Sequence, residues 1–263
     1  MKILPNDKVK MLQFPVLSED CNISHFVTTR QGGVSKGAYA SFNPGEYSGD
    51  DPEAVRANRK LLSDAIGIPT ERIFTPFQVH GAEIRSIESF FLSLPLDEQR
   101  VYLHGVDALV TNVPGVCIAV STADCVPVLL YAPDVKAVAA VHAGWRGTVK
   151  QIGGKTVRLM KEKFGSDPKD IIAAIGPSIG KCCFEVDRDT ASLFDEKYCV
   201  SKPNSKFHVD LWSVNRDNLV SEGLEPINIY ISDECTICNS DKYYSYRVHK
   251  EKTGRQVAVI ALP

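Results

Sequence analysis

The chain has 263 residues, of which 44% are hydrophobic and 24% charged, the composition of an ordinary globular protein. Its 30 basic and 32 acidic residues give a formal net charge of -2, which excludes a strongly basic surface for a nucleic acid polymer. No apolar run is long enough to span a bilayer, and Asn6, Asp7 and Lys8 interrupt the opening where a signal peptide needs an apolar core. We therefore expect a cytoplasmic protein, without a membrane partner, whose eight cysteines are reduced thiols.

The first quarter of the chain predicts two strands, a long loop and a helix. Residues 10–17 and 23–29 are apolar enough for strands, and a proline places the first at a sheet edge. The segment 28–51 has five glycines and little periodicity, which is typical of a functional loop. A helix then begins after Asp51, which can cap it, and continues to about Ile66.

The centre of the chain is the most strand-like part. Residues 74–87 predict a strand that ends at Val79, a turn at His80 and Gly81, and a second strand. A polar connection around 94–100 leads to three short apolar runs, each bounded by Pro, Gly or Asp as buried strands are. These runs are 116–120, 126–132 and 135–141.

The last part of the chain alternates helices and strands. A stripe of apolar residues over 145–164 predicts a helix that ends at Gly165, in which Gly153 and Gly154 either weaken the helix or mark close packing. Asp210 can cap another helix. The remaining predicted strands are 171–175, 227–231 and 256–262. Since no repeat or linker divides the chain, we expect one α/β domain over 1–263, with a mixed β-sheet core flanked by helices.

Three metal-binding residue types follow apolar runs at the points where strands are expected to end. They are His80, Cys125 and His142. A thiolate and two imidazoles suit zinc, and three protein ligands leave a fourth position open for water or substrate. Each residue alone is more often a buried core side chain, and their spacing matches no compact zinc motif.

The other cysteines give weaker signals. Cys235 and Cys238 have the spacing of a CxxC motif, but no second CxxC or HxxxH completes four ligands, so we interpret them as small residues at a turn. The neighbours Cys182 and Cys183 could be reactive, but packing is the simpler interpretation. Cys21, Cys117 and Cys199 are expected to be core or surface residues.

Several arginines could bind an anion. Arg30 begins the long glycine-rich loop, where a phosphate could contact both guanidinium and backbone N–H groups. Arg146 begins a helix, an unfavourable place for a cation unless an anion binds there. Arg247 follows a tyrosine-rich cluster that could stack on a planar base or belong to the core, and Arg59 lies on an amphipathic helix where a surface ion pair is expected.

Several unusual segments, in order along nearly the whole chain, resemble the YfiH/YlmD-type laccase-domain family. The segments are TTRQGGVS and YASFN within 28–43, QVHG at 78–81, DALVT at 107–111, TADCVP at 122–127, HAGWRG at 142–147, GPSIG with CCFEV at 176–186, and DKYYSYR with TGR at 241–255. The family is often labelled polyphenol oxidase and is associated with purine nucleoside phosphorylase and adenosine deaminase activity. The resemblance implies that His80, Cys125 and His142 bind zinc. It also implies a nucleoside and phosphate pocket between the metal and the loop from Arg30 to Asn43.

The activity that follows from the resemblance is zinc-dependent phosphorolysis of adenosine to adenine and ribose 1-phosphate, together with deamination of adenosine. Inosine, guanosine and methylthioadenosine are further substrates to expect. Arg30 is the first choice for binding phosphate, with Asn43, Gln78, Arg146 and Arg247 as further binding residues. Zinc would activate a water molecule for attack on C6 of adenine.

Two carboxylates are the acid–base residues to consider. Asp124 could orient His80 or His142, or carry a proton, and Glu185 is the second choice. A capping Asp and a loop Glu are the simpler interpretations, and the sequence does not choose between these roles.

Other functions are possible for the same residues. Cys125 with His142 could form a thiol hydrolase or amidase acting on a small molecule or a cell-wall precursor. A copper-dependent oxidase fits less well, since four further histidines, none in an HxH pair, are too few for a copper cluster. A zinc-stabilised binding module is the non-enzymatic alternative. We expect a monomer or weak homodimer.

Overall fold

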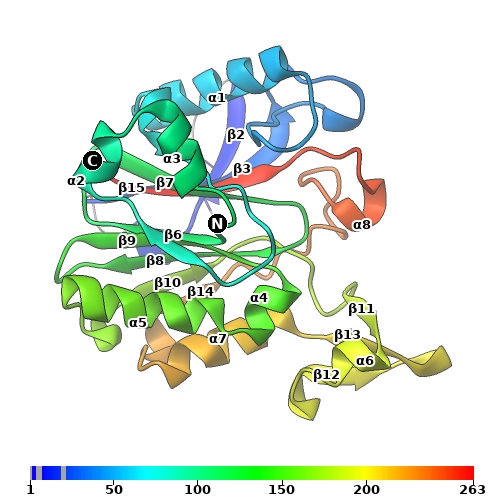
Figure 1. The fold of residues 1–263 in the computed structure, drawn as a ribbon. Coiled ribbons are helices and arrows are strands. Elements are labelled where there is room, and N and C mark those ends of the chain that lie inside the picture. The colour runs from blue at the N-terminus through cyan, green and yellow to red at the C-terminus, as the bar shows by residue number, and fades with distance from the viewer. Residues whose placement is uncertain (1, 4–7, 19–21) are drawn as a thin grey trace.

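The computed structural model describes residues 2–3, 8–18 and 22–263; Asn6, Asp7 and Cys21, discussed above, lie outside these ranges. Two six-stranded sheets and one three-stranded sheet form the framework. The two large sheets stack face to face, with helix α1 (Pro52–Ile66) over one and helices α5 (Ile152–Phe164) and α7 (Leu211–Ser221) under the other (Figure 1). The arrangement is therefore a four-layer helix–sheet–sheet–helix sandwich.

The first large sheet has the order β1-β2-β3-β15-β7-β4. Its strands are β1 (Lys2–Ile3), β2 (Val9–Gln13), β3 (Ser24–Gly32), β15 (Gln256–Leu262), β7 (Val116–Thr122) and β4 (Ile73–Phe74). All neighbours are antiparallel except β4 and β7, which are parallel. The C-terminal strand thus lies in the middle of the sheet, between strands from the start and the centre of the chain.

The second large sheet has the order β14-β10-β8-β9-β6-β5. Its strands are β14 (Ile229–Ile231), β10 (Ile172–Ile175), β8 (Val126–Ala132), β9 (Ala137–Ala143), β6 (Ala108–Thr111) and β5 (Ile84–Ser86). The central strands pair antiparallel, whereas β14 and β5 add to the two edges in parallel. A small antiparallel sheet of β11 (Glu185–Asp187), β13 (Lys206–Val209) and β12 (Cys199–Ser201) projects to one side (Figure 1).

Alternation along the strands divides their apolar side chains between separate cores. Ile118, Val120 and Ile260 from the first sheet pack against Leu129 and Val138 from the second, in a cluster that fills the space between the sheets. The neighbouring residues on the same strands point to the opposite faces, toward α1 or toward α5 and α7. Because both faces of each sheet are covered, the strands are continuously apolar rather than alternating.

The predicted N-terminal caps of two helices are confirmed. Asp51 accepts a hydrogen bond from the Glu53 N–H at the start of α1, and Asp210 caps α7 through the Ser213 N–H. The helix predicted over 145–164 is two helices, α4 (Trp145–Val149) and α5, because the backbone at Gln151 is left-handed with φ of 58°.

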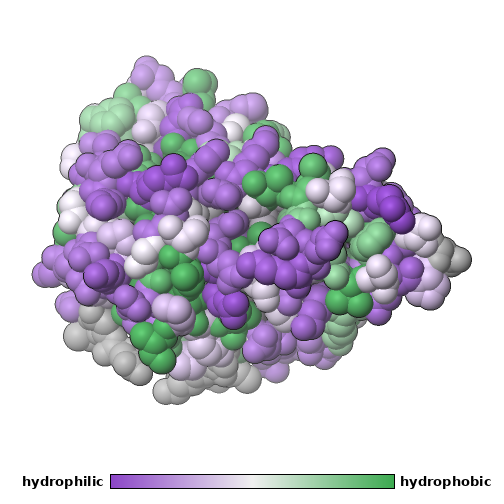
Figure 2. Space-filling model, turned by 90° about the horizontal axis from the view of Figure 1, so that it is seen from below, coloured by the Kyte–Doolittle hydropathy of each residue, from purple (hydrophilic) through white to green (hydrophobic). Residues whose placement is uncertain are grey.

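Gly153 and Gly154 mark close packing rather than a weak helix. A Cβ atom on Gly154 would lie 2.9 Å from Cγ of Glu222, next to α7. Seen from below, the surface is mostly hydrophilic and its hydrophobic residues lie in scattered groups (Figure 2).

Three details of the predicted secondary structure are wrong. The strand expected to end at Val79 ends at Phe74, because Pro76 cannot continue the ladder. The strand predicted over 10–17 ends at Gln13 and gives way to a 3-10 turn that begins at Pro15. The polar connection around 94–100 contains helix α3 (Leu96–Tyr102), which follows α2 (Ser89–Ser93). The other short helices are α6 (Arg188–Ala191) and α8 (Tyr246–His249).

No helix among the described residues has both the length and the apolar character needed to cross a membrane. The mixed α/β class predicted from the sequence is confirmed, while the division of the strands into stacked sheets was not apparent in the periodicity.

One buried histidine makes the fold sensitive to acid. The Nε2 atom of His25 accepts a hydrogen bond of 2.9 Å from the Phe14 N–H, and the side chain is 1% exposed. Burial lowers the pKa of His25 from 6.5 to about 4, although its backbone contact with Phe14 partly opposes this shift. The unfolded chain therefore binds a proton below pH 6.5 that the folded chain does not, so stability decreases as the pH falls from 6.5 to 4.

We expect this single residue to account for about 3 kcal/mol of the loss in unfolding free energy between pH 7 and pH 4. His25→Gln keeps an acceptor for the Phe14 N–H but does not titrate. Denaturant unfolding of both proteins at several pH values measures the effect. The wild type should lose stability more steeply than the variant between pH 6.5 and 4, and parallel curves would contradict the assignment.

Candidate functional site

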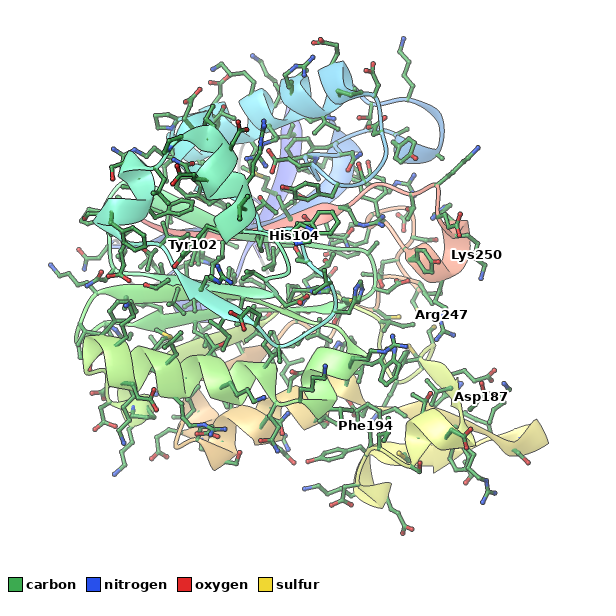
Figure 3. All side chains as sticks on the ribbon, in the orientation of Figure 1. Tyr102, His104, Asp187, Phe194, Arg247 and Lys250 are labelled. Carbon is green, nitrogen blue, oxygen red and sulfur yellow. The ribbon has the colours of Figure 1, made fainter. Side chains whose placement is uncertain are left out.

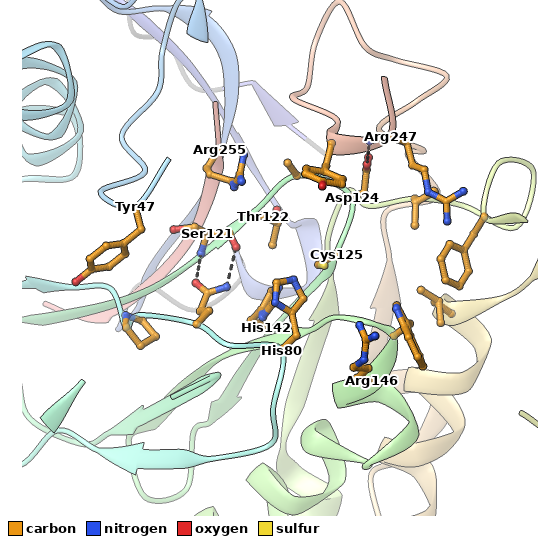
Figure 4. A pocket seen from close by; sticks show the side chains of 18 of the residues that line it. Tyr47, His80, Ser121, Thr122, Asp124, Cys125, His142, Arg146, Arg247 and Arg255 are labelled. Carbon is orange, nitrogen blue, oxygen red and sulfur yellow. Dashed lines mark hydrogen bonds between the residues drawn. The ribbon is translucent and has the colours of Figure 1, made fainter. Parts of the chain in front are cut away.

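His80, Cys125 and His142 come together at one end of the two-sheet stack. Their ligand atoms lie within 4.8 Å of one another, and they face a common cavity (Figure 4). His142 lies near the end of β9, Cys125 directly precedes β8, and His80 is in the loop between β4 and β5. The structure thus brings together the three residues that the sequence analysis selected as metal ligands.

Strand pairing explains why two of these residues meet. In the antiparallel ladder of β8 and β9, Val126 lies opposite Ala143 and Pro127 opposite His142. The residue just before β8 is therefore next to the end of β9. Gly144 permits this close approach, since a Cβ atom there would lie 3.0 Å from Cδ2 of His80 and 3.2 Å from Sγ of Cys125.

A fully buried carboxylate holds the third residue in place. Asp107 accepts hydrogen bonds from three successive backbone N–H groups, those of Val79 (3.4 Å), His80 (3.0 Å) and Gly81 (2.7 Å). The left-handed backbone of His80, with φ of 59°, lets these N–H groups converge on one anion. The same carboxylate lies 2.8 Å from Nδ1 of His142, so the other ring nitrogen is directed to the site.

The three side chains also perturb one another electrostatically. Burial alone would raise the pKa of the Cys125 thiol, but the neighbouring His142 and His80 outweigh burial and lower that pKa to about 6. Burial would lower the pKa of His142, but Cys125 and Asp107 raise it to about 9. Asp107 remains ionised, because contacts with His142 and backbone N–H groups lower its pKa against the opposing effect of burial.

This donor set fits a metal ion. Two imidazoles and one thiolate are a combination that binds zinc, and three protein ligands are typical of sites that keep a position for water or substrate. The carboxylate–histidine contact between Asp107 and His142 is the support that metal-binding histidines usually have. Asp107 belongs to the DALVT segment, but its supporting role was not identified from the sequence.

The cavity in front of these residues has a volume of about 580 Å³, within the range of small-molecule sites. Three arginines line it: Arg146, Arg247 and Arg255. Arg146 stacks on the Trp145 ring at 4.1 Å, and Arg247 donates to the Glu185 carbonyl at 3.1 Å. Figure 3 shows Arg247 between Lys250, at the end of helix α8, and the small sheet that carries Asp187. The cavity therefore combines a floor that contains the His80–Cys125–His142 cluster with cationic walls.

Arg255 was not among the predicted site residues. Its guanidinium faces the cavity in Figure 4, while Nη1 donates to the carbonyls of Thr253 (2.7 Å) and Gly254 (3.0 Å). Burial lowers its pKa, opposed by the charge of Cys125. The TGR segment that ends in Arg255 is the signal that could have identified it.

Two of the predicted phosphate-binding residues do not line this cavity. The Arg30 side chain donates to the carbonyls of Ala40 and Ser240 and lies 4.9 Å from the Tyr244 ring centroid, so it connects two loops. Asn43 is fully buried, and its Oδ1 accepts the Arg255 N–H at 2.9 Å. A sequence motif cannot distinguish a residue that contacts a ligand from one that supports the loop around it.

Gln78 lines the cavity, but both ends of its amide are bound to one strand. Its Nε2 donates to the Ser121 carbonyl at 2.9 Å, and its Oε1 accepts the Ser121 N–H at 2.7 Å, as the dashed lines in Figure 4 show. Gln78 therefore replaces a strand pairing that Pro76 prevents, and it holds the segment leading to His80 against the end of β7.

The two predicted acid–base carboxylates have other partners. Asp124, with φ of 89°, accepts from Thr236 Oγ1 (2.6 Å), Ser245 Oγ (3.0 Å) and the Arg247 N–H (2.7 Å). It binds the first turn of α8, whose N-cap is Ser245, and it does not contact His142, which is bonded to Asp107 instead. Glu185 is exposed on the small sheet, its carboxylate is 3.8 Å from His208, and it is not among the residues that line the cavity.

Other side chains singled out in the sequence are structural. Arg59 is buried rather than in a surface ion pair: it donates to the Ile73 carbonyl at 2.8 Å and pairs with Glu46 at 3.2 Å. Cys117 is buried in the first sheet and Cys199 is partly buried, as expected. His104 stacks on Phe77 with ring centroids 4.7 Å apart.

A family model, curated relatives and solved structures each match most of this chain. A family model described as multi-copper polyphenol oxidoreductase laccase matches residues 24–263. A protein named purine nucleoside phosphorylase from Bacteroides thetaiotaomicron is 41% identical over 260 residues, which cover 96% of each chain. A protein named adenosine deaminase RL5, from an unknown prokaryotic organism, is 37% identical over 240 residues, 89% of this chain and 91% of the relative. The crystal structure of YlmD from Geobacillus stearothermophilus has a TM-score of 0.89 at 32% identity and covers 99% of this chain and 98% of that one.

The contact between Asp107 and His142 leads to a prediction about metal affinity. Asp107→Asn removes the negative charge that faces His142 and presents an amide group to the N–H donors around it. We expect this variant to lower zinc affinity 10- to 100-fold, the usual effect of losing a partner of a metal-binding histidine. Competition with a zinc-binding dye measures the change. Glu83→Gln, a charge-neutralising change at an exposed carboxylate on the loop that carries His80, is the control, and equal affinity of D107N and wild type would contradict the role.

Proposed function

We propose that this chain, which belongs to the family described as multi-copper polyphenol oxidoreductase laccase, is a zinc-dependent purine nucleoside phosphorylase. We propose adenosine deaminase activity as well, because one relative carries that name. The observation that carries the proposal is the His80–Cys125–His142 cluster on the floor of a cavity with arginines on its walls. The names of the relatives supply the substrate class, a purine nucleoside and inorganic phosphate. We propose that the protein acts in the cytoplasm as a monomer or weak homodimer.

We assign phosphate binding to Arg146 and Arg247. Both guanidinium groups line the cavity, and a guanidinium binds phosphate oxygens through pairs of N–H donors. Stacking on Trp145 occupies the face of Arg146 and leaves the N–H groups at its edge for a ligand. Nη1 of Arg247 donates to the Glu185 carbonyl, and the guanidinium lies over the Phe184 ring, which together fix the direction of the side chain.

Aromatic residues at the cavity provide surfaces for a purine. Tyr47 and Phe77 both line the cavity and lie edge to face with ring centroids 5.0 Å apart. Both side chains are partly exposed, as expected of groups that stack on a ligand rather than fill a core. Tyr246 lines the cavity as well and is also exposed.

In phosphorolysis a phosphate oxygen bonds to C1′ of the ribose as the bond to the purine nitrogen breaks. The two arginines would hold the phosphate on one side of the sugar, and adenine would leave toward the aromatic residues. Zinc, held by His80, Cys125 and His142, would supply Lewis-acid activation of the substrate or of water, the latter for deamination at C6. Asp107 would keep His142 in the ring orientation that the metal needs.

A second function rests on a specific contact in the same site. Cys125, His142 and Asp107 form a thiol–imidazole–carboxylate series, the order used by cysteine hydrolases and amidases. Metal content separates the two proposals. A nucleophilic thiol reacts with iodoacetamide and works after chelation, whereas a metal-bound thiolate is protected and its activity is lost with the metal.

Copper oxidase chemistry has weaker support. The one His-containing metal cluster among the described residues has two histidines and a cysteine, whereas oxygen reduction by copper oxidases uses several more imidazoles. His25 is buried between the sheets and His104 stacks on Phe77.

A chromatographic product assay tests the proposed activity. Zinc-loaded protein is incubated with adenosine, with and without inorganic phosphate. Adenine and ribose 1-phosphate formed only with phosphate support the phosphorylase, and inosine formed in both conditions supports deamination. Unchanged adenosine in both conditions would reject the nucleoside proposal, and hydrolysis of amide or thioester substrates would then be measured.

The phosphate-binding assignment makes a separate prediction. Arg146→Gln and Arg247→Gln should each raise the KM for phosphate about 10-fold or more, because each removes charge-assisted hydrogen bonds to phosphate. Deamination, which uses no phosphate, should change much less. Arg158→Gln, on the outer surface of α5 in an ion pair with Glu222, is the matched control. Equal losses in both reactions would show that these arginines support the cavity rather than bind phosphate.

A further inference from the structure

Four cysteines outside the site already described form a second cluster. Cys182 and Cys183 lie in the loop after β10, and Cys235 and Cys238 in the loop after β14. Their sulfur atoms all lie within 4.8 Å of one another. The CxxC motif of Cys235 and Cys238 therefore has the two further thiols that it was expected to lack.

Sheet topology brings these loops together. β10 and β14 are adjacent parallel strands, so the loops that follow them leave the sheet at the same edge. Ser178 and Cys235 continue the pairing as an isolated parallel bridge, with Ser178 N–H donating to the Glu234 carbonyl and Thr236 N–H to the Ser178 carbonyl. The two pairs of thiols are thus held by backbone hydrogen bonds rather than by chance contact of flexible chains.

The separations between sulfurs fit a tetrahedral metal site. Sγ of Cys238 lies 3.7 Å from Sγ of Cys182 and 3.6 Å from Sγ of Cys183. With metal–sulfur bonds of about 2.3 Å, two thiolates on the same tetrahedral zinc ion are about 3.8 Å apart. A disulfide would need about 2.05 Å. The sulfur atoms are therefore already close to the positions that a single metal ion requires.

The surroundings of Cys235 favour a thiolate. Cys235 is 5% exposed, and its sulfur accepts the Gly180 N–H at 3.3 Å. Gly180 has no room for a side chain, since a Cβ atom would lie 2.9 Å from Trp212 and 3.3 Å from Sγ of Cys182. A buried sulfur that accepts a backbone N–H suits a metal-bound thiolate.

We propose that Cys182, Cys183, Cys235 and Cys238 bind one zinc ion in a structural site separate from the His80–Cys125–His142 site. Binding would replace the thiol protons, which pass to solvent, with four sulfur–metal bonds. Four protein ligands fill the tetrahedral shell and leave no position for water, so this ion stabilises structure and takes no part in chemistry.

The location of the four-cysteine cluster indicates which part of the protein the second zinc ion would stabilise. Its two loops continue directly into the cavity wall: Ile179 and Phe184 on one side, and the segment leading to Arg247 on the other. Ile179 N–H donates to the Asp124 carbonyl at 2.8 Å, and Thr236 Oγ1 donates to the Asp124 carboxylate at 2.6 Å. A metal that joins the loops would therefore hold the wall of the cavity and the small sheet that begins at Glu185.

Counting metal ions in variants tests the proposal. Zinc per chain is measured by plasma mass spectrometry in protein purified without chelators. We expect two zinc ions in the wild type, one in Cys183→Ser/Cys238→Ser, one in Cys125→Ser, and two in the control Cys199→Ser, whose sulfur lies near the Ala191 carbonyl outside both clusters. Because Cys125→Ser empties only the catalytic site, failure of the proposed catalytic zinc and failure of the second site give different counts.

Cobalt substitution of the wild type and of Cys125→Ser tests the proposal even if the double variant does not fold. Four thiolates give stronger sulfur-to-cobalt charge-transfer absorption than one thiolate, so most of this absorption should persist in Cys125→Ser. The proposal is overturned if Cys125→Ser loses all bound metal. It is also overturned if denatured, unreduced protein titrates four fewer thiols than reduced protein. That deficit corresponds to two disulfides, whereas the proposal needs all four cysteines as thiols.

Discussion

The site depends on one buried anion. Asp107 is fully buried, and folding can accommodate its charge only because three backbone N–H groups and His142 surround it. The same contacts determine the path of the loop around His80, whose left-handed backbone is a conformation that costs on the order of 1–3 kcal/mol without compensation. One carboxylate therefore positions two of the three residues of the cluster, one through its backbone and one through its ring.

The two-sheet stack places the third residue. Cys125 is in the connection from β7, in the first sheet, to β8, in the second, and so lies where the chain passes from one sheet to the other. Helices α1, α5 and α7 lie along the outer faces of the sheets, so this end is lined by loops and by the first residues of α4, α7 and α8 (Figure 1). The cavity opens there, and the apolar layers behind it keep the ends of the strands in fixed positions.

Sequence patterns were most informative where local chemistry determines structure. The caps of α1 and α7, the buried strands β7 to β9, and the positions of Cys125 and His142 follow strand-end and capping rules that act over a few residues. His80 joins them from a loop, since the strand before it ends at Phe74. The family resemblance inferred from motifs is confirmed by relatives that match nearly the whole chain. What the sequence could not provide was pairing between distant segments. Without it, Arg30 and Asn43 resembled ligand-binding residues, and the thiols of Cys182 and Cys183 could not be matched with the CxxC motif.

Asp124 has partners that differ from those expected of a residue next to the cluster. It directly precedes Cys125 and has a left-handed backbone, both features of a catalytic neighbour. Its carboxylate, however, is saturated by Thr236, Ser245 and the Arg247 N–H, so a proton placed on it would break contacts that hold α8. Asp107 and Asp124 therefore act in parallel. The first fixes the histidines, the second fixes the segment that carries Arg247, and Cys125 lies between them. The backbone of Arg247 is therefore joined to the cluster by one hydrogen bond to Asp124 and one peptide unit from Asp124 to Cys125.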